Sequence, residues 1–349
     1  MADFEVNLCA AVPVVLPFEH VLFDEQRRIL FLALNDLLKY SESFRVSLPS
    51  IKTTFPVVIE LFDSPEPIKG FCQVWHPKWQ CSYKFLCFTA HATVDMQQEF
   101  DLGTERSALI QMDDMERNLV FIGFADEFAS EICHLLTATT IALPGALKTA
   151  DPTVIVNGNL HRELPMLDGW FDHAIERIRK DGWPPIREIA VVTAWDWFSR
   201  LPGLDTGFVS GPVGRAISAL THIIYPSSPF DDLGTGLLWA LLGLEAVYGR
   251  GPTSIGEQLR EKSELLLGKS RNTKRRFATA YNFRSRFVHG DLDIPFRYLD
   301  DVPHEDTVRM QNTEWDASFF MQAVLISTIQ ELVLRNVHHV AFPYVLSTT

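Results

Sequence analysis

The 349-residue sequence lacks the short motifs that mark several large enzyme classes. It contains no P-loop, no G-x-G-x-x-G dinucleotide fingerprint and no G-x-S-x-G nucleophile turn. Interpretations as an NTPase, a dinucleotide-dependent enzyme or an α/β-hydrolase therefore have no support. The sequence also has no internal repeat and no low-complexity tract.

Cysteine is scarce, and the first residues lack a basic segment ahead of an apolar run. The five cysteines are irregularly spaced and form no C-x2-C pair. These features predict an intracellular protein in a reducing compartment, the cytoplasm.

Five residues resemble a set of zinc ligands: Cys72, His76, Cys81, Cys87 and His91. If residues 81–91 form one strand, its two ends lie about 33 Å apart. One tetrahedral ion cannot bridge that distance. We therefore predict no metal site and no cofactor.

Long hydrophobic runs are missing as well. The most apolar segment, residues 233–249, is shorter than the roughly 20 residues that span a bilayer, and it contains Glu245. We therefore predict no transmembrane helix and no membrane partner.

A stretch without any acidic residue runs from Leu265 through Gly290. It holds seven cations: Lys269, Arg271, Lys274, Arg275, Arg276, Arg284 and Arg286. The whole chain has a formal net charge of −13, which argues against a protein that coats nucleic acid indiscriminately. Two interpretations of the basic stretch remain open, a solvated helix face and a local phosphate-binding patch.

Residues 1–165 have the pattern of an α+β domain. Apolar residues at helical spacing predict a helix over 23–40 with a possible Asp24 cap, and 127–143 is predicted as a second helix. Segments rich in β-branched and aromatic residues predict strands at 55–62, 70–75, 81–94 and 118–124. The turn-rich residues 144–165 are predicted to form the domain boundary.

Residues 166–349 are predicted to be almost wholly helical. Periodicity and end signals predict helices at 187–200, 212–225, 233–249, 255–267, 274–289 and 314–336. Ser254, Thr273 and Thr313 are the predicted caps of the last three. The predicted fold class is therefore mixed, an α+β region followed by an all-α bundle whose core spans about 205–340.

Arg284 and Glu245 each interrupt an apolar stripe. Arg284 follows Phe277 and Tyr281 and precedes Val288 at i, i+4, i+7, i+11 spacing. A guanidinium in such a stripe needs a partner, and Glu245 lies in the apolar stripe of 233–249. We predict that the two are partly buried and pair, so that Glu245→Ala lowers stability by several kcal/mol.

His289 follows Arg284 by five residues, which on a helix is about 7.5 Å of rise and 140° of net rotation. The two side chains can still converge on one phosphate if Gly290 reverses the chain as a C′ residue. The alternative is that His289 is only a cationic C-terminal residue favoured by the helix dipole.

The string YNFRSRFVHG at 281–290, with its R-x4-H pattern, resembles the signature of HEPN domains, specifically of the Apea-like branch. The apolar segment LLWALLGLEAVYG and the intervening basic helix are similar to that branch too. The resemblance covers about 205–340 and does not extend to 1–165. It implies a HEPN-type four-helix bundle that forms a homodimer with its two R-x4-H motifs facing each other.

Many HEPN proteins are metal-independent ribonucleases of bacterial defence or toxin systems. The resemblance implies catalysis by Arg284, which clamps the phosphate, and by two His289 side chains, which act as base and acid and leave 2′,3′-cyclic phosphate ends. Residues predicted to support them are Glu245, Tyr281, Asn282, Ser285 and Asp291. Residues expected to bind the RNA are Lys269, Arg271, Lys274, Arg275, Arg276 and Arg286.

Position 291 is Asp, where some HEPN toxins have a tyrosine that a partner nucleotidyltransferase modifies, so that type of control is not predicted. Asp291 and Asp293 either orient His289 or indicate that catalysis has been lost. Two hypotheses follow. The protein is a dimeric endoribonuclease whose residues 1–165 sense a trigger or select the RNA, or it is an inactive HEPN module that dimerises and binds RNA or a protein partner.

Overall fold

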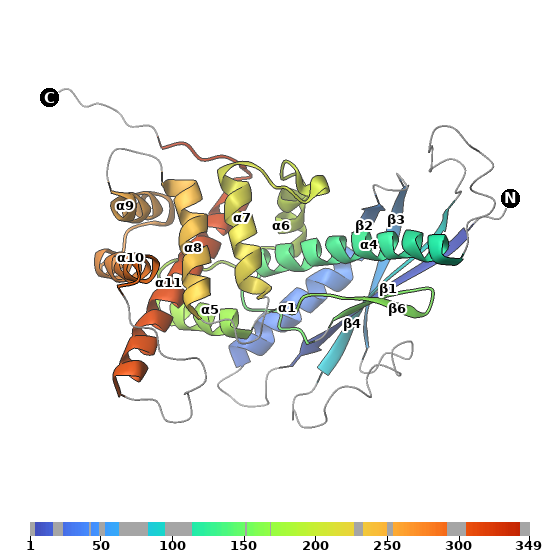
Figure 1. Cartoon of the computed structure of the whole chain (residues 1–349), viewed down its shortest axis with the longest axis horizontal. Coiled ribbons are helices and arrows are strands. Elements are labelled where there is room, and N and C mark those ends of the chain that lie inside the picture. The colour runs from blue at the N-terminus through green and yellow to red at the C-terminus, as the bar shows by residue number, and fades with distance from the viewer. Residues whose placement is uncertain are drawn as a thin grey trace. The chain divides into compact units, whose positions relative to one another are not determined.

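The protein is described by a computed structural model that covers residues 4–16, 24–41, 43–48, 53–62, 83–94, 114–150, 152–167, 169–226, 233–249, 254–291 and 305–342. The chain forms two compact units (Figure 1). Unit 1 consists of residues 1–140 and 146–167, and unit 2 consists of residues 141–145 and 168–349. The mixed fold class, with a helical C-terminal part, is confirmed.

Unit 1 is built on a six-stranded antiparallel sheet with the strand order β2-β3-β4-β1-β5-β6. The strands are β1 (Phe4–Val15), β2 (Arg45–Leu48), β3 (Thr53–Phe62), β4 (Tyr83–Val94), β5 (Thr153–Val156) and β6 (Asn159–Glu163). Helix α1 (Asp24–Tyr40) packs against β3, with the predicted apolar stripe around Leu30 and Leu34 buried. Strands β3 and β4 confirm two predicted strands, whereas the predicted strand at 70–75 lies outside the described residues.

The predicted strand at 118–124 is wrong. These residues lie inside helix α4 (Asp114–Ala142), which continues through the correctly predicted helix at 127–143. Strand propensity depends on the surroundings, and helix formation is cooperative, so a long helix can propagate through a short β-favouring segment. The local signal from Val120, Phe121 and Ile122 was overridden in this way.

The turn-rich segment 144–165 is not a plain linker. Half of it forms the β5–β6 hairpin at the edge of the sheet, and β5 pairs with β1. Asn157 and Gly158 have φ values of 48° and 80°, the combination that a two-residue type I′ hairpin turn requires. This Asn-Gly pair was a readable hairpin signal that the sequence analysis missed.

Unit 2 is a helical bundle. Its helices are α5 (Gly169–Asp181), α6 (Val191–Phe198), α7 (Gly211–Ile224), α8 (Leu233–Tyr248), α9 (Ile255–Leu267), α10 (Thr273–His289) and α11 (Glu305–Leu334). Helix α11 packs against each of the others and forms the centre of the bundle, and α7 lies beside α8 (Figure 1). Helices α5 and α6 therefore join the bundle, although they lie outside the predicted core of 205–340.

Close helix packing in unit 2 depends on Gly243 of α8. A Cβ atom added there would lie 2.9 Å from Leu325 Cδ1 of α11 and 3.1 Å from Ala219 Cβ of α7. The missing side chain therefore lets three helices approach one another.

One helix of the described chain is long and apolar enough to cross a membrane. It is Asn312–Leu334 within α11, and 89% of its most apolar window is buried inside the protein. The burial accounts for the apolar composition, because the central helix of a bundle passes the same test.

Three predicted helix caps differ from the structure. Ser254 occupies the N-cap position of α9 but makes no side-chain capping bond. Asn272 is the N-cap of α10, and Thr273 is its buried first residue. Helix α11 begins at Glu305, and the Thr313 hydroxyl donates to the Arg309 carbonyl one turn back, as it does within a continuing helix.

Candidate functional site

Helix α10 carries the R-x4-H motif and ends as predicted at a left-handed glycine. Gly290 has φ 75°, its N–H donates to the Phe287 carbonyl, and the Asp291 N–H donates to the Arg286 carbonyl over 2.8 Å. This pair of bonds is the Schellman motif, in which a C′ glycine reverses the chain. His289 is thereby the last helical residue, and its side chain is exposed to solvent.

The buried face of α10 differs from the predicted stripe. It consists of Thr273, Phe277, Ala280 and Phe283, and the Phe277 ring meets Phe320 of α11 edge-on with centroids 5.3 Å apart. Val288, predicted to continue the stripe, is 54% exposed. Arg284 therefore lies at the edge of the buried face, because the core follows the 277, 280, 283 row instead of the 277, 281, 284 row.

The predicted contact between Arg284 and Glu245 is confirmed. Arg284 Nη2 lies 3.8 Å from Glu245 Oε1, and the two side chains are 26% and 19% exposed. The guanidinium also lies 5.8 Å from the centroid of the Tyr281 ring, within cation–π range. Tyr281 in turn packs on Gly256 of α9, where an added Cβ would lie 3.3 Å from the ring. Residues of α8, α9 and α10 thus fix the position of the Arg284 guanidinium.

The desolvation of the Glu245 carboxyl is poorly compensated by polar contacts. Its Oε1 atom is buried and makes no hydrogen bond within the described residues. Desolvation raises the pKa of this carboxyl above its usual value, and the opposing attraction of Arg284 does not cancel the effect. Because Arg284 is reached by water, we now expect Glu245→Ala to cost only about 1 kcal/mol.

The pH dependence of stability tests the state of Glu245. A carboxyl with a raised pKa in the folded protein favours folding while it is protonated. Wild type should therefore lose stability relative to Glu245→Gln as the pH rises from about 4, near the unfolded-state pKa of glutamate, towards neutrality. Urea unfolding of both proteins across this range measures the difference. A difference that grows in favour of wild type with rising pH would show that the ion pair dominates.

The other predicted supporting residues surround the end of α10. Asn282 and Asp291 are exposed, and Ser285 is half-buried. Arg286 is exposed and donates from Nη2 to the Asp291 carbonyl over 3.1 Å, so it holds the reversed chain in place. Asp293 lies outside the described residues.

Two exposed apolar side chains flank the Arg284–Glu245 pair. Val288 lies one turn after Arg284 on α10, and Leu242, which is 49% exposed, lies one turn before Glu245 on α8. We call these two residues the apolar flank. They give the motif a surface that another apolar surface can cover.

The basic run, residues 269–276, lies in the α9–α10 loop and in the first turn of α10, at the opposite end from the motif. Lys269, Arg271, Lys274 and Arg275 are exposed. Arg275 precedes His289 by fourteen residues of helix, which corresponds to about 21 Å. The run and the R-x4-H motif are therefore separated by most of the length of α10.

Arg276 differs from the rest of the basic run. Its Nη1 donates to Asp181 Oδ2 over 3.0 Å, and its guanidinium lies 4.0 Å from the centroid of the Phe320 ring. Burial lowers the pKa of this guanidinium, and Asp181 opposes the shift. Arg276 was expected to contact RNA. In the structure, its side chain already joins α10 to α5 and α11.

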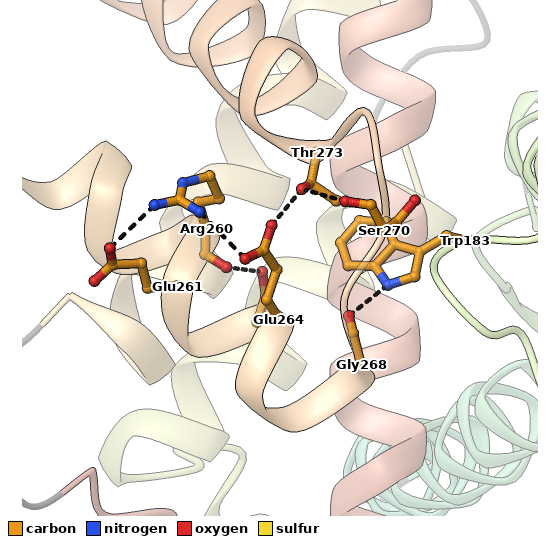
Figure 2. A network of polar contacts seen from close by, with 8 residues as sticks. Trp183, Arg260, Glu261, Glu264, Gly268, Ser270 and Thr273 are labelled. Carbon is orange, nitrogen blue, oxygen red and sulfur yellow. Dashed lines mark hydrogen bonds and ion pairs between the residues drawn. The ribbon is translucent and has the colours of Figure 1, made fainter.

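The loop between α9 and α10 is held by a polar network (Figure 2). Glu264 accepts from the Thr273 hydroxyl and from Arg260 Nη1 at 3.2 Å, and Arg260 also contacts Glu261. The Trp183 indole N–H donates to the Gly268 carbonyl over 2.8 Å at the other end of the loop. The basic residues of the loop therefore project from a fixed backbone.

A cleft of about 610 Å³ opens beside this loop. Its wall is mostly polar and comes from α5 and the segment that follows it, the α9–α10 loop, α10 and α11. The lining residues are Arg177, Asp181, Trp183, Ser270, Asn272, Thr273, Arg275, Arg276, Thr279, Thr313, Asp316, Ala317 and Phe320. The sequence analysis missed the contributions of α5 and α11. No local pattern marks them, because they meet α10 only in the folded bundle.

Among the described residues, no group of three or more His, Cys, Asp or Glu side chains is placed to hold a metal ion. Of the five residues weighed as zinc ligands, Cys72, His76 and Cys81 lie outside the described residues. Cys87 is buried in β4, which raises its thiol pKa to about 12, and His91 Nδ1 lies 2.7 Å from Asn7 Oδ1.

Comparison of the chain with known protein families, curated proteins and solved structures finds no match.

Proposed function

We propose that unit 2 is a HEPN-type bundle and that the protein is a metal-independent endoribonuclease. The observation that carries the proposal is the arrangement at the end of α10. Arg284 is held by Glu245 and Tyr281, and the exposed His289 follows it at the last helical residue. A phosphate between them would meet a cation held by its neighbours and a solvent-exposed acid–base group.

The proposed reaction uses two copies of the chain. His289 of one copy takes the proton of the RNA 2′-hydroxyl, whose oxygen attacks the neighbouring phosphorus. The bond from phosphorus to the 5′-oxygen breaks, and His289 of the second copy protonates that oxygen. Arg284 stabilises the charge on the phosphate, and the product carries a 2′,3′-cyclic phosphate. Unit 1 then senses a trigger or selects the RNA in the cytoplasm, in a defence or toxin-like response.

Incubation of the purified protein with total RNA in EDTA tests this function. We expect cleavage that persists without divalent metal and products with 2′,3′-cyclic phosphate ends. Cleavage that disappears in EDTA would contradict the metal-free mechanism. A complete lack of cleavage with retained RNA binding would favour the second candidate, an inactive module, which the exposed carboxylate of Asp291 beside the motif favours.

The proposed dimer predicts a role for the apolar flank. We expect a dimer at micromolar concentration and at least tenfold weaker association for Val288→Asp, because a carboxylate would be buried in an apolar interface. Sedimentation analysis of both proteins measures this. Leu265→Asp is the matched control, since Leu265 lies on α9 and is 72% exposed. A wild-type monomer, or equal effects of the two substitutions, would contradict the proposed interface.

A further inference from the structure

One face of the unit 1 sheet carries a cleft of about 380 Å³, a volume within the range of about 300–1,000 Å³ that is typical of small-molecule pockets. The strand register builds its wall. Val58 of β3 pairs with Thr89 of β4, which pairs on its other side with Cys9 of β1. Side chains alternate along a strand, so these three point away from the core residues Val57 and Ala10. We call Val58, Thr89 and Cys9 the sheet row.

The sheet row is accessible to a ligand and uncharged. Val58 is 50% exposed, and Thr89 and Cys9 are half-buried. Burial raises the pKa of the Cys9 thiol to about 11, so this thiol is neutral at neutral pH. In the part of the chain that the structure describes, no Lys, Arg, Asp or Glu lines the cleft, and Glu60 follows Val58 by two residues on the same face. An anionic ligand therefore finds no opposite charge in this wall.

His91 lines the cleft next to the sheet row, and its neighbour orients it. His91 of β4 pairs with Asn7 of β1, and both side chains are exposed. The His91 Nδ1 atom lies 2.7 Å from the Asn7 carboxamide oxygen, which can only accept, so Nδ1 carries the proton. The Nε2 atom of the neutral ring is then an acceptor. Asn7 is itself fixed, because its N–H donates to Asn157 Oδ1 over 2.8 Å and its carbonyl accepts from the Asn157 N–H over 2.9 Å.

We propose that this cleft binds a small uncharged aromatic molecule that donates one hydrogen bond, such as an indole or a phenol. The flat ring lies on the sheet row, and its N–H or O–H donates to His91 Nε2. Such a molecule combines an apolar body with one polar group, which matches the wall. The inference gives a chemistry to the trigger that unit 1 senses, and it rests on the proposed function only for that role. Binding itself needs neither His289 nor RNA cleavage.

Saturation-transfer NMR titrations of the full chain test the proposal. The probes are indole, 1-methylindole, which lacks the N–H donor, and indole-3-acetate, which adds a negative charge. His91→Phe removes the acceptor and keeps an aromatic ring, and Val58→Glu places a carboxylate on the sheet row. Ile122→Glu is the matched control, because Ile122 lies on α4 of unit 1, is 41% exposed and does not line the cleft. Circular dichroism verifies that each variant is folded.

We expect indole to bind wild type at least about threefold more tightly than either other probe, roughly the effect of one neutral hydrogen bond. The advantage over 1-methylindole should disappear in His91→Phe, since the variant has no acceptor to lose. Val58→Glu should weaken indole binding by about tenfold or more, and Ile122→Glu by less than about twofold.

The site would be overturned by a lack of indole binding, by an advantage over 1-methylindole that is absent from wild type or persists in His91→Phe, or by equal losses for the two glutamate variants. Binding of indole-3-acetate as tight as that of indole would also contradict an uncharged ligand. A protein that binds indole without cleaving RNA would refute the proposed ribonuclease alone, and a protein that cleaves RNA without binding indole would refute this site alone.

Discussion

His289→Ala should reduce the rate of RNA cleavage by about 10²- to 10⁴-fold, because a positioned proton-transfer group typically contributes that much to the rate. RNA affinity should remain close to that of wild type, since the exposed cations of the basic run are unchanged. Single-turnover cleavage of a labelled RNA and filter binding measure the two quantities separately.

The matched control for this substitution is His339→Ala. His339 is an exposed histidine beyond the end of α11, outside the candidate site, and its removal should leave the rate unchanged. Cleavage that survives in His289→Ala would place the chemistry elsewhere and leave the binding-module hypothesis for unit 2.

Gln330→Leu should lower the free energy of unfolding of unit 2 by about 3–5 kcal/mol. The Gln330 side chain is fully buried and donates to the carbonyls of Ile141 and Arg187, each over 2.8 Å. Its Oε1 accepts from the Arg187 N–H over 2.9 Å. Leucine has a similar size but leaves these backbone groups unpaired, and each buried unpaired group costs about 1–3 kcal/mol.

Gln322→Leu provides the comparison. Gln322 lies on the same helix and is also buried, but within the described part of the chain its side chain makes one hydrogen bond, which it donates to the Ser318 hydroxyl. We expect a loss of about 1 kcal/mol. Urea unfolding of the three proteins measures both values, and equal losses for the two variants would show that the backbone bonds of Gln330 contribute little.

The parts of the fold that were predictable are those with a strong local pattern. The apolar stripe of α1 and the boundaries of α8, α9 and α10 follow from periodicity and from Pro and Gly. Strands β3 and β4 follow from their β-branched and aromatic content. Pairing of Arg284 with Glu245 was predictable because each charge interrupts an apolar stripe. The predictions of a cap at Thr273 and of a strand at 118–124 were wrong. The Thr273 hydroxyl bonds to Glu264, nine residues away, and residues 118–124 belong to the long helix α4, so neither outcome is visible in a short window of sequence.

The cleft beside α10 was beyond sequence reasoning. Its walls come from residues near 180, 275 and 316, and nothing in one sequence indicates that they meet. The basic run was visible, but its members could not be told apart. Only the fold separates Arg276, which is bonded to Asp181, from Arg275, which remains available.

The central position of α11 has a consequence for the synthesis of the protein. Unit 2 includes residues 141–145, and Gln330 of α11 holds Ile141 across 189 positions of the chain. The helices from α5 to α10 leave the ribosome before the helix on which they pack. Their apolar faces therefore have no α11 to pack on until that helix has been synthesised. Contacts of such long sequence separation also form slowly. Nascent chains that stop before α11 should depend on chaperones, whereas the sheet of unit 1 can assemble once its last hairpin has emerged.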